Sequence, residues 1–360
     1  MNEIRSAPNN PLLAICVPTY NRAPSLTKLL SQLAALKGRY GDQLEFCISN
    51  NGSTDETRSV IEAFERQWPV QVQHQSTNIG GTLNIIAVAG QMRARWGMWC
   101  GDDDDIDTDV IEQILSLLQT FSPETWMLVD STDGQGSGQY MSNFAVGEHT
   151  SAAFRRALLC SGLDPLGFMG VHVFPRSAVP MIESLQLADA RPWPHMVGLL
   201  RYLTTPDVRV YVLHKAATGQ AKGGVKLFWT AGDLARLHLS KLRLLRRTYA
   251  ATRSNYLFLH ALMLSELYAP RKLKLLLLWK LCEHRDFKSN ALADFRENYH
   301  ELGKLKLLTW PHHMLVVFLN KISSNNYDKL FQALNKTYLR RLYIDQKRKY
   351  RSYDGMRRGI

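Results

Sequence analysis

The amino-acid sequence predicts an α/β fold built on a mostly parallel sheet. Over the first 130 residues, short β-rich apolar runs alternate with segments of helical periodicity, which is typical of parallel sheets flanked by helices. The chain of 360 residues is 45% hydrophobic, which is enough for a large core and, at this length, for two domains. These two observations exclude a chain that is disordered as a whole.

The expected elements follow one another along the chain. The apolar runs that predict strands are residues 12–17, 44–49, 70–74, 96–100 and 126–129. Behind Pro24, leucines recur at i, i+3, i+4 and i+7, which predicts an amphipathic helix with Leu26, Leu29, Leu30 and Leu33 on its buried face. A second such helix follows Asp55, with Val60, Ile61, Phe64 and Trp68. Further on, residues 196–203 predict a helix and residues 208–213 a strand, and a glycine-bearing basic loop is expected over 216–226.

The charge is unevenly distributed. Residues 241–360 carry 25 Lys+Arg against 9 Asp+Glu, whereas residues 1–240 carry 19 against 23. We therefore expect two regions, 1–226 and 227–360, of which the second is helical, leucine-rich and basic. Cationic helices with apolar faces suit an anionic membrane surface, although a helical bundle with solvated basic faces has the same composition. The basic cluster at 347–351 lacks a groove-reading motif, so we expect no nucleic-acid partner.

The cysteines and the N-terminus bear on location. The five cysteines are scattered and form no CxxC pair, as expected of buried thiols in a reducing compartment. Residues 1–10 lack the layout of a signal peptide, and no stretch reaches the length of a membrane-spanning helix. The expected location is cytoplasmic, peripheral at the inner face of the cytoplasmic membrane.

Four consecutive carboxylates, residues 102–105, follow the apolar run at 96–100. Like charges this close repel one another unless a cation lies among them, and an all-oxygen cluster suits Mg²⁺ or Mn²⁺. The alternative is a solvated acidic turn. Two more polar clusters, 18–22 and 50–55, also follow expected strands, where ligands of parallel sheets collect. The three clusters therefore predict one crevice that holds a metal ion and a diphosphate.

Taken together, these clusters and the segment 78–80 resemble glycosyltransferase family 2 in order and spacing, over roughly residues 10–215. Within the family the chain is similar to bacterial transferases that build O-antigen and other surface polysaccharides, including abequosyltransferase-like members. The resemblance implies a GT-A nucleotide-diphospho-sugar transferase fold, a UDP-, dTDP- or CDP-linked sugar donor, a divalent Mn²⁺ or Mg²⁺ ion held by a DXD-type motif, and inversion at the anomeric carbon.

The resemblance also implies roles for individual residues. The residues expected to bind the nucleotide-sugar are Pro18, Thr19, Tyr20, Arg22, Asn51, Asn78, Gly80, Asp103, Asp104 and, from the basic loop, Lys222. Asn51 stands where many members place an aspartate against the pyrimidine ring, which leaves the base open. The basic loop could instead be a linker into the last third. Four aspartates leave the register of the motif open. Alignment on Ile106 predicts Asp103 on the ribose side and either Asp105 or Asp104 as the metal ligand. We favour Asp105 at the metal, with Asp103 also at the metal site and Asp102 as a supporting residue.

Inversion requires a base that takes the proton of the attacking hydroxyl. The corresponding region lacks the usual Glu-Asp pair but offers Asp189, our first candidate, and His195, our second. A histidine at a helix start is also a common structural hydrogen-bonding group. Trp193 can stack on a sugar or simply pack.

The function predicted from the sequence is an inverting, metal-dependent hexosyl- or deoxyhexosyltransferase that moves a sugar to a saccharide acceptor, lipid-linked, in surface polysaccharide biosynthesis. A nucleotidyltransferase is the first alternative, although such enzymes bring a glycine-rich triphosphate loop that residues 18–22 lack. A non-catalytic saccharide- or membrane-binding scaffold is the second.

Overall fold

The computed structural model describes residues 11–132, 141–185 and 193–220. The chain divides into two units, Met1–Gly224 and Val225–Ile360, and all of the described residues lie in the first. The predictions for region 227–360, including its membrane association, fall outside the described residues and stay predictions. None of the helices in the described part is long and apolar enough to cross a bilayer.

A nine-stranded mixed sheet runs through this unit in the order β3-β2-β1-β4-β8-β6-β9-β5, with β7 paired to β9. The strands are β1 Leu13–Thr19, β2 Leu44–Asn50, β3 Gln71–His74, β4 Trp96–Trp99, β5 Asp104–Ile106, β6 Thr125–Thr132, β7 Gly147–Thr150, β8 His172–Pro175 and β9 Arg209–Gln220. Strands β3, β2, β1 and β4 are parallel, whereas β8 runs antiparallel to both β4 and β6. All five strands expected in the first 130 residues are present, and the α/β fold class is confirmed.

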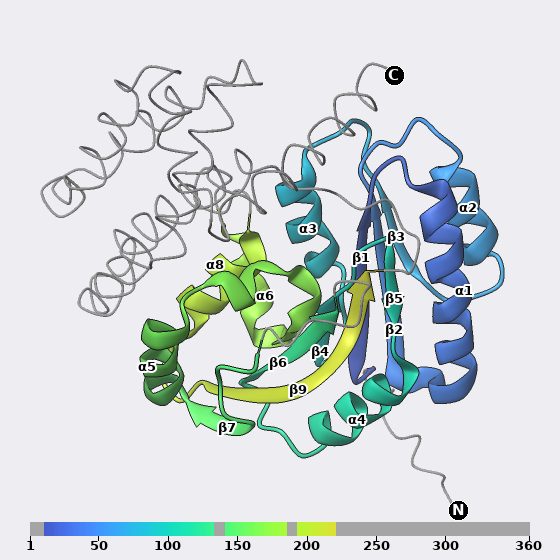
Figure 1. The fold of residues 1–360 in the computed structure, drawn as a ribbon. Helices are drawn as coiled ribbons and strands as arrows, with labels where there is room; N and C mark the ends of the chain where they lie inside the picture. The colour runs from blue at the N-terminus through green and yellow to red at the C-terminus, as the bar shows by residue number, and fades with distance from the viewer. Residues whose placement is uncertain (1–10, 133–140, 186–192, 221–360) are drawn as a thin grey trace, which may run out of the picture. The chain divides into compact units, whose positions relative to one another are not determined.

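Helices cover both faces of the sheet (Figure 1). They are α1 Ala23–Tyr40, α2 Thr57–Glu65, α3 Gly81–Gly90, α4 Thr108–Leu118, α5 Ser151–Ser161, α6 Val179–Glu183 and α8 Pro194–Tyr202, with 3₁₀ turns η1 Gly41–Gln43, η2 Asp164–Gly167, η3 Met169–Val171 and η4 Arg176–Ala178. Helices α1 and α2 pack together on one face, and α3, α6 and α8 pack together on the other.

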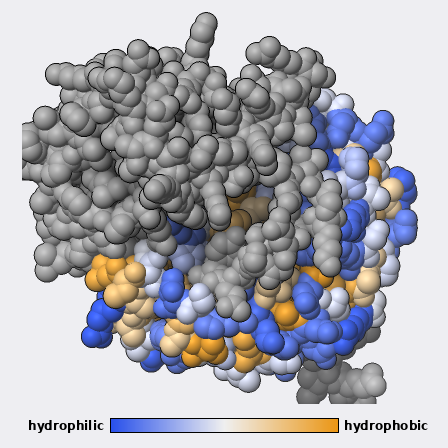
Figure 2. Space-filling view, in the orientation of Figure 1, coloured by the Kyte–Doolittle hydropathy of each residue, from blue (hydrophilic) through white to orange (hydrophobic). Residues whose placement is uncertain are grey.

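The sequence pattern accounts for the core. The expected stripe of α1, Leu26, Leu29, Leu30 and Leu33, is buried, as are Ile61 and Phe64 of α2. The central strands are buried on both faces, which is why they are apolar without alternation. The apolar residues that remain on the face drawn in Figure 2 form small patches among hydrophilic ones.

Two expectations are corrected. Residues 216–220 are not part of a loop, because β9 continues through them and pairs with β5 and β6. Three cysteines are buried as expected, Cys16, Cys47 and Cys100, but Cys160 is exposed, because it lies on the outer side of α5.

Candidate active site

Three loops meet where the parallel strands β1, β2 and β4 end. The N–H of Asn51, after β2, donates to the carbonyl of Thr19 at 2.9 Å. The hydroxyl of Thr19 in turn donates to Oδ2 of Asp102, after β4, at 2.8 Å. The three polar clusters that the sequence indicated are therefore joined at the carboxyl edge of the sheet.

The loop after β1 is locked to the loop after β2. Asn21 adopts a left-handed conformation, φ 51°, and its Oδ1 accepts from the N–H of Thr54 at 2.8 Å while its own N–H donates to Ser53 at 2.9 Å. Asparagine tolerates this conformation better than most residues. The neighbouring Tyr20 is 40% exposed. Pro18 lies within β1.

Asp55 joins the starts of two helices. Its Oδ2 accepts from the N–H of Ala23, the first residue of α1, at 3.3 Å, and its Oδ1 from the N–H of Thr57, the first residue of α2, at 3.0 Å. Partial burial raises the pKa of Asp55, but the hydrogen bonds from Thr57 and Ala23 outweigh it and hold the pKa below its ordinary value. One carboxylate thus satisfies N–H groups of both helices.

Asn51 holds the loop that precedes α3. Its Nδ2 donates to Oδ1 of Asn78 at 3.0 Å, and its Oδ1 accepts from the N–H of Ile79 at 2.9 Å. The same Oδ1 of Asn78 accepts from the N–H of Gly80 at 2.8 Å, and Gly80 has φ 87°, which favours glycine. Asn51 and Asn78 therefore fix the loop at residues 78–80, and Asn51 is 2% exposed.

The first two aspartates of the run contact the β1 loop. Asp102 accepts from Thr19, and Oδ2 of Asp103 lies 3.5 Å from Nη1 of Arg22. Burial raises the pKa of Asp102 to about 6, against the lowering effect of the Thr19 hydrogen bond. Arg22 is thus positioned beside the run, with 29% of its side chain exposed.

Asp104 is enclosed in the turn that it closes. Its Oδ2 accepts from the N–H of Gly101 at 3.0 Å, and a Cβ atom on Gly101 would come within 2.8 Å of that oxygen. Burial raises the pKa of Asp104 to about 7, and the charge of Asp103 adds to the shift. Only glycine leaves room for this carboxylate at position 101.

Asp105 faces helix α1. Its Oδ1 lies 2.7 Å from Nζ of Lys28 and accepts from Nε2 of Gln32 at 2.8 Å. Oε1 of Gln32 accepts from the N–H of Ile106 at 2.9 Å, so one amide holds both residues. The prediction that Asp105 ligates the metal stays a prediction, and its carboxylate already has a cation beside it.

The residues present fit a divalent cation that is shared with a ligand. Within the described ranges, no group of three or more His, Cys, Asp and Glu side chains is arranged to hold a metal ion. Asp102 and Asp104 nevertheless bring carboxylate oxygens into one tight turn, where Oδ2 of Asp102 accepts from the hydroxyl of Thr19 and Oδ2 of Asp104 accepts from the N–H of Gly101. Mg²⁺ and Mn²⁺ sites built from one or two carboxylates and the oxygens of a diphosphate need no more than this.

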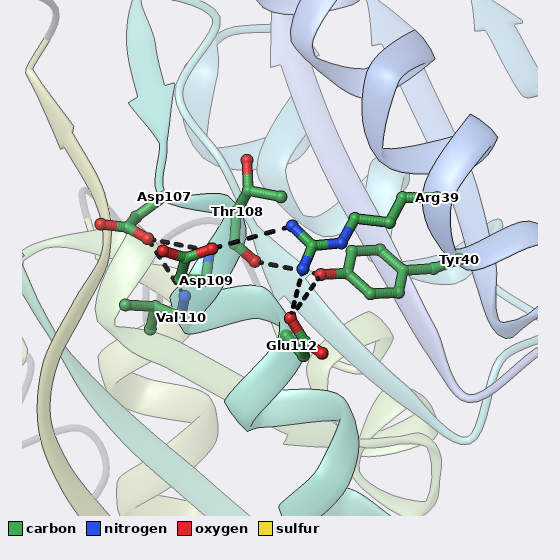
Figure 3. A network of polar contacts seen from close by, with 7 residues as sticks. All are labelled: Arg39, Tyr40, Asp107, Thr108, Asp109, Val110 and Glu112. Carbon is green, nitrogen blue, oxygen red and sulfur yellow. Dashed lines mark hydrogen bonds and ion pairs between the residues drawn. The ribbon is translucent and has the colours of Figure 1, made fainter.

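The C-terminal end of α1 contacts the start of α4, just after the run (Figure 3). Nη2 of Arg39 lies 2.6 Å from Oε2 of Glu112 on α4, and the hydroxyl of Tyr40 contacts the same oxygen at 3.3 Å. Asp107 caps α4 by accepting from the N–H groups of Asp109 and Val110. Helix α1 thus contacts the segment 103–112 at both of its ends.

The candidate bases lie in different situations. Asp189 and Lys222 fall outside the described residues. His195 is 3% exposed, and its Nε2 donates to the carbonyl of Gly167 at 3.2 Å. Burial lowers the pKa of His195 well below its ordinary value, and His172 adds to the shift. These contacts are those of a structural hydrogen-bonding group, and the base role stays a prediction.

Three residues that organise the candidate site were not predicted from the sequence: Lys28, Gln32 and His172. Lys28 and Gln32 carry a usable signal, because they are polar residues one turn apart beside the leucine stripe of α1. Asp55 was included in the polar cluster 50–55, but its bonds to two helix starts were not predicted. His172 stands in an apolar run, and nothing in the sequence around it indicates a role in the site.

Comparison with known proteins agrees with this geometry. Residues 14–143 match the family model described as Glycosyl transferase family 2. The chain is 30% identical over 112 residues to abequosyltransferase RfbV of Salmonella typhimurium, a match that covers 31% of this chain and 32% of that protein. It is 44% identical over 55 residues to validoxylamine A glucosyltransferase of Streptomyces hygroscopicus subsp. jinggangensis, over 15% of this chain and 13% of that protein. The chain thus spans at most about a third of the length of these relatives.

Among solved structures, S. aureus TarS 1-349 is similar with a TM-score of 0.58 and 15% identity, over 81% of this chain and 80% of that one. The same protein in complex with UDP-GlcNAc gives a TM-score of 0.58 and 16% identity, over 88% of this chain and 92% of that one. At this identity the similarity establishes the fold, a GT-A type sheet with flanking helices.

Proposed function

Because the chain carries a glycosyl transferase family 2 domain, matched over residues 14–143, we propose that it moves a sugar from a nucleotide-sugar donor to a saccharide acceptor in the building of a bacterial surface polysaccharide. The observation that carries the proposal is the joining of the β1 loop to the acidic run, Thr19 to Asp102 and Arg22 to Asp103. It brings a guanidinium and several carboxylates to one edge of the sheet. The name of the abequosyltransferase relative supports a sugar transferase.

The nucleotide part of the donor lies against the ends of β1 and β2 in this proposal. Tyr20 has an exposed ring that can flank a base, and the backbone around Asn51 and Gly80 provides polar groups beside it. Arg22 can pair with a diphosphate, for which its planar guanidinium is suited. Donors with UDP, dTDP and CDP all fit this description.

A divalent ion, when bound, would neutralise the charge that develops on the departing nucleoside diphosphate. The run at 102–105 would hold it through its carboxylate oxygens, and Arg22 beside Asp103 adds a fixed positive charge. Thr19 keeps Asp102 oriented by donating to it. Metal dependence is thus part of the proposal, supported by the oxygen ligands that these residues supply.

We also propose that the anomeric configuration inverts, with Asp189 as the first candidate for the base. This part rests on the family pattern. Inversion occurs in a single displacement, and that displacement needs one general base. A lipid-linked acceptor and a location at the inner face of the cytoplasmic membrane complete the proposal, and the basic region 227–360 supports them by its composition.

Calorimetric titration tests the proposal. UDP, dTDP, CDP and GDP are each titrated with Mn²⁺ and with EDTA into the wild type, Arg22→Gln and the control Arg58→Gln. Arg58 pairs with Glu62 on the surface of α2, away from the run. We expect one nucleotide to bind more tightly with Mn²⁺ and Arg22→Gln to weaken it by about tenfold or more, as for a lost charge-assisted pair. The absence of binding by all four nucleotides would contradict the proposal, and consumption of a sugar 1-phosphate with a nucleoside triphosphate would favour a nucleotidyltransferase.

A further inference from the structure

The segment 164–171, which we call the acceptor turn, consists of η2, Phe168 and η3 and leads into β8. Its second half, η3, lies against β4, β6 and β9. Gly170 approaches Thr218 so closely that a Cβ atom would collide with its hydroxyl. Thr218 is paired with Ile106 in the β5–β9 ladder. The turn therefore borders the run through β9.

Two buried histidines hold the acceptor turn. Nε2 of His172 donates to the carbonyl of Leu166 at 3.0 Å, and Nε2 of His195 donates to the carbonyl of Gly167 at 3.2 Å. The two rings are 5.0 Å apart and lie against Trp99, which ends β4 three residues before the first aspartate of the run. Each histidine binds one of two consecutive carbonyls, those of Leu166 and Gly167. These two hydrogen bonds fix the orientation of the backbone that precedes Phe168.

Two aromatic side chains lie at the turn: Phe168 belongs to it, and Trp193 lies beside it. Phe168 is 47% exposed, one of the few large apolar side chains with that exposure in the described ranges. The indole of Trp193 lies beside Gly167, where a Cβ atom would be 3.9 Å from its Nε1. Two aromatic residues thus flank one glycine. Contact between an exposed aromatic ring and another apolar surface is favourable in water, because both surfaces are removed from the solvent. The C–H face of a pyranose is such a surface.

We propose that Phe168 and Trp193 form the platform on which a sugar ring of the acceptor stacks, and that His172 and His195 are positioning residues that hold it. The inference rests on the proposed function, because the saccharide that stacks here is the acceptor of the proposed transfer. It deepens that function by naming the residues that select the acceptor. The occupant is a saccharide, since the platform adjoins the polar run and offers two rings.

The test is saturation-transfer NMR with octyl β-glucoside, octyl β-galactoside and octyl α-mannoside as probes. We expect saturation of sugar-ring protons by the wild type, loss of about fivefold or more of that signal in Phe168→Ala, and retention in Phe168→Tyr, which keeps the ring. Val146→Ala is the matched control, because Val146 is 55% exposed outside the turn. Saturation confined to the octyl chain, an unchanged signal in Phe168→Ala, or its loss in Phe168→Tyr would each overturn the platform.

Nucleotide calorimetry on the same samples separates the two proposals. A wild type that binds a nucleotide but saturates no sugar ring overturns the platform and leaves the proposed function. A wild type that saturates sugar rings through Phe168 but binds no nucleotide overturns the proposed function and supports a saccharide-binding platform.

Discussion

The hydroxyl of Thr19 donates to the carboxylate of Asp102 across 83 residues of sequence, at 2.8 Å. This bond ties the end of β1 to the end of β4 at the start of the acidic run. Thr19 is 2% exposed, so water does not substitute for its hydroxyl.

Replacement of Thr19 by Val should destabilise the fold and weaken nucleotide binding together. The change keeps the shape and removes the donor, and a hydrogen bond to a charged group contributes about 1.5–3 kcal/mol. Urea denaturation measures the free energy of unfolding, and calorimetry the affinity. Thr19→Ser retains the hydroxyl and should stay near the wild type. A loss in Thr19→Ser as large as that in Thr19→Val would contradict the role of the hydroxyl, since only Thr19→Ser keeps it.

The four aspartates of the run should differ in their effect on metal-dependent binding. We expect Asp104→Asn to weaken nucleotide binding in Mn²⁺ by about tenfold or more, and to remove the difference between Mn²⁺ and EDTA. Asp105→Asn should cost about threefold or less, because Lys28 already neutralises that carboxylate. Calorimetry with the matched Asn variants checks both. The reverse order would instead support Asp105, which the sequence favours at the metal.

Removal of the Asp55 carboxylate should loosen two helix starts at once. We expect Asp55→Ala to lower the free energy of unfolding by about 1–2 kcal/mol, because caps are lost at both α1 and α2. Since the folded state lowers the pKa of Asp55, its contribution is present above the unfolded pKa and is lost as the pH falls through the folded value. Denaturation at neutral and acidic pH measures this, with Asp55→Asn as the control that keeps one acceptor. A loss that is equally large at pH 3 would contradict the assignment.

The buried histidines should make the fold sensitive to mild acid. Burial lowers the pKa of His172 from 6.5 to about 4, so between these values the unfolded chain binds more protons than the folded one. Stability should therefore fall as the pH decreases through this window, by up to about 3 kcal/mol for this one group. His172→Gln should flatten the dependence measured by urea denaturation between pH 7 and pH 4.5. His149→Gln, a change at a histidine near the surface, should leave the slope as in the wild type.

Much of the candidate site at the ends of β1, β2 and β4 could be predicted from the sequence, because these strands are apolar runs that end in polar clusters. The clusters at 18–22 and 50–55 meet the acidic run at one edge, as predicted. The short strands β5, β7 and β8 were not predicted. β5 is formed by Asp104–Ile106, and no pattern of apolar residues marks a strand made of carboxylates. It exists because β9 continues past residue 215 and pairs with it.

The inner contacts of the site could not be predicted for a different reason. The side-chain amide of Gln32 hydrogen-bonds to both Asp105 and Ile106. These two bonds depend on how α1 crosses the sheet, which tertiary packing decides. The same holds for the histidine pair, whose members stand 23 positions apart and meet only through the fold. Single residues of this kind become visible only when the elements around them are in place.

The pairing of β5 with β9 determines how the site tolerates a shift in strand register or a deletion in the aspartate run. Asp104, Asp105 and Ile106 are paired with successive residues of β9, and a shift by one position would exchange the two faces of β5. In a motif with alternating acidic and neutral residues, such a slip would remove the carboxylates from the site. Here the neighbours are also aspartates, so after a slip toward the start of the run each position still carries an acid. The repeated residue provides redundancy, and a single-codon deletion within the run leaves three acids in a row at this edge.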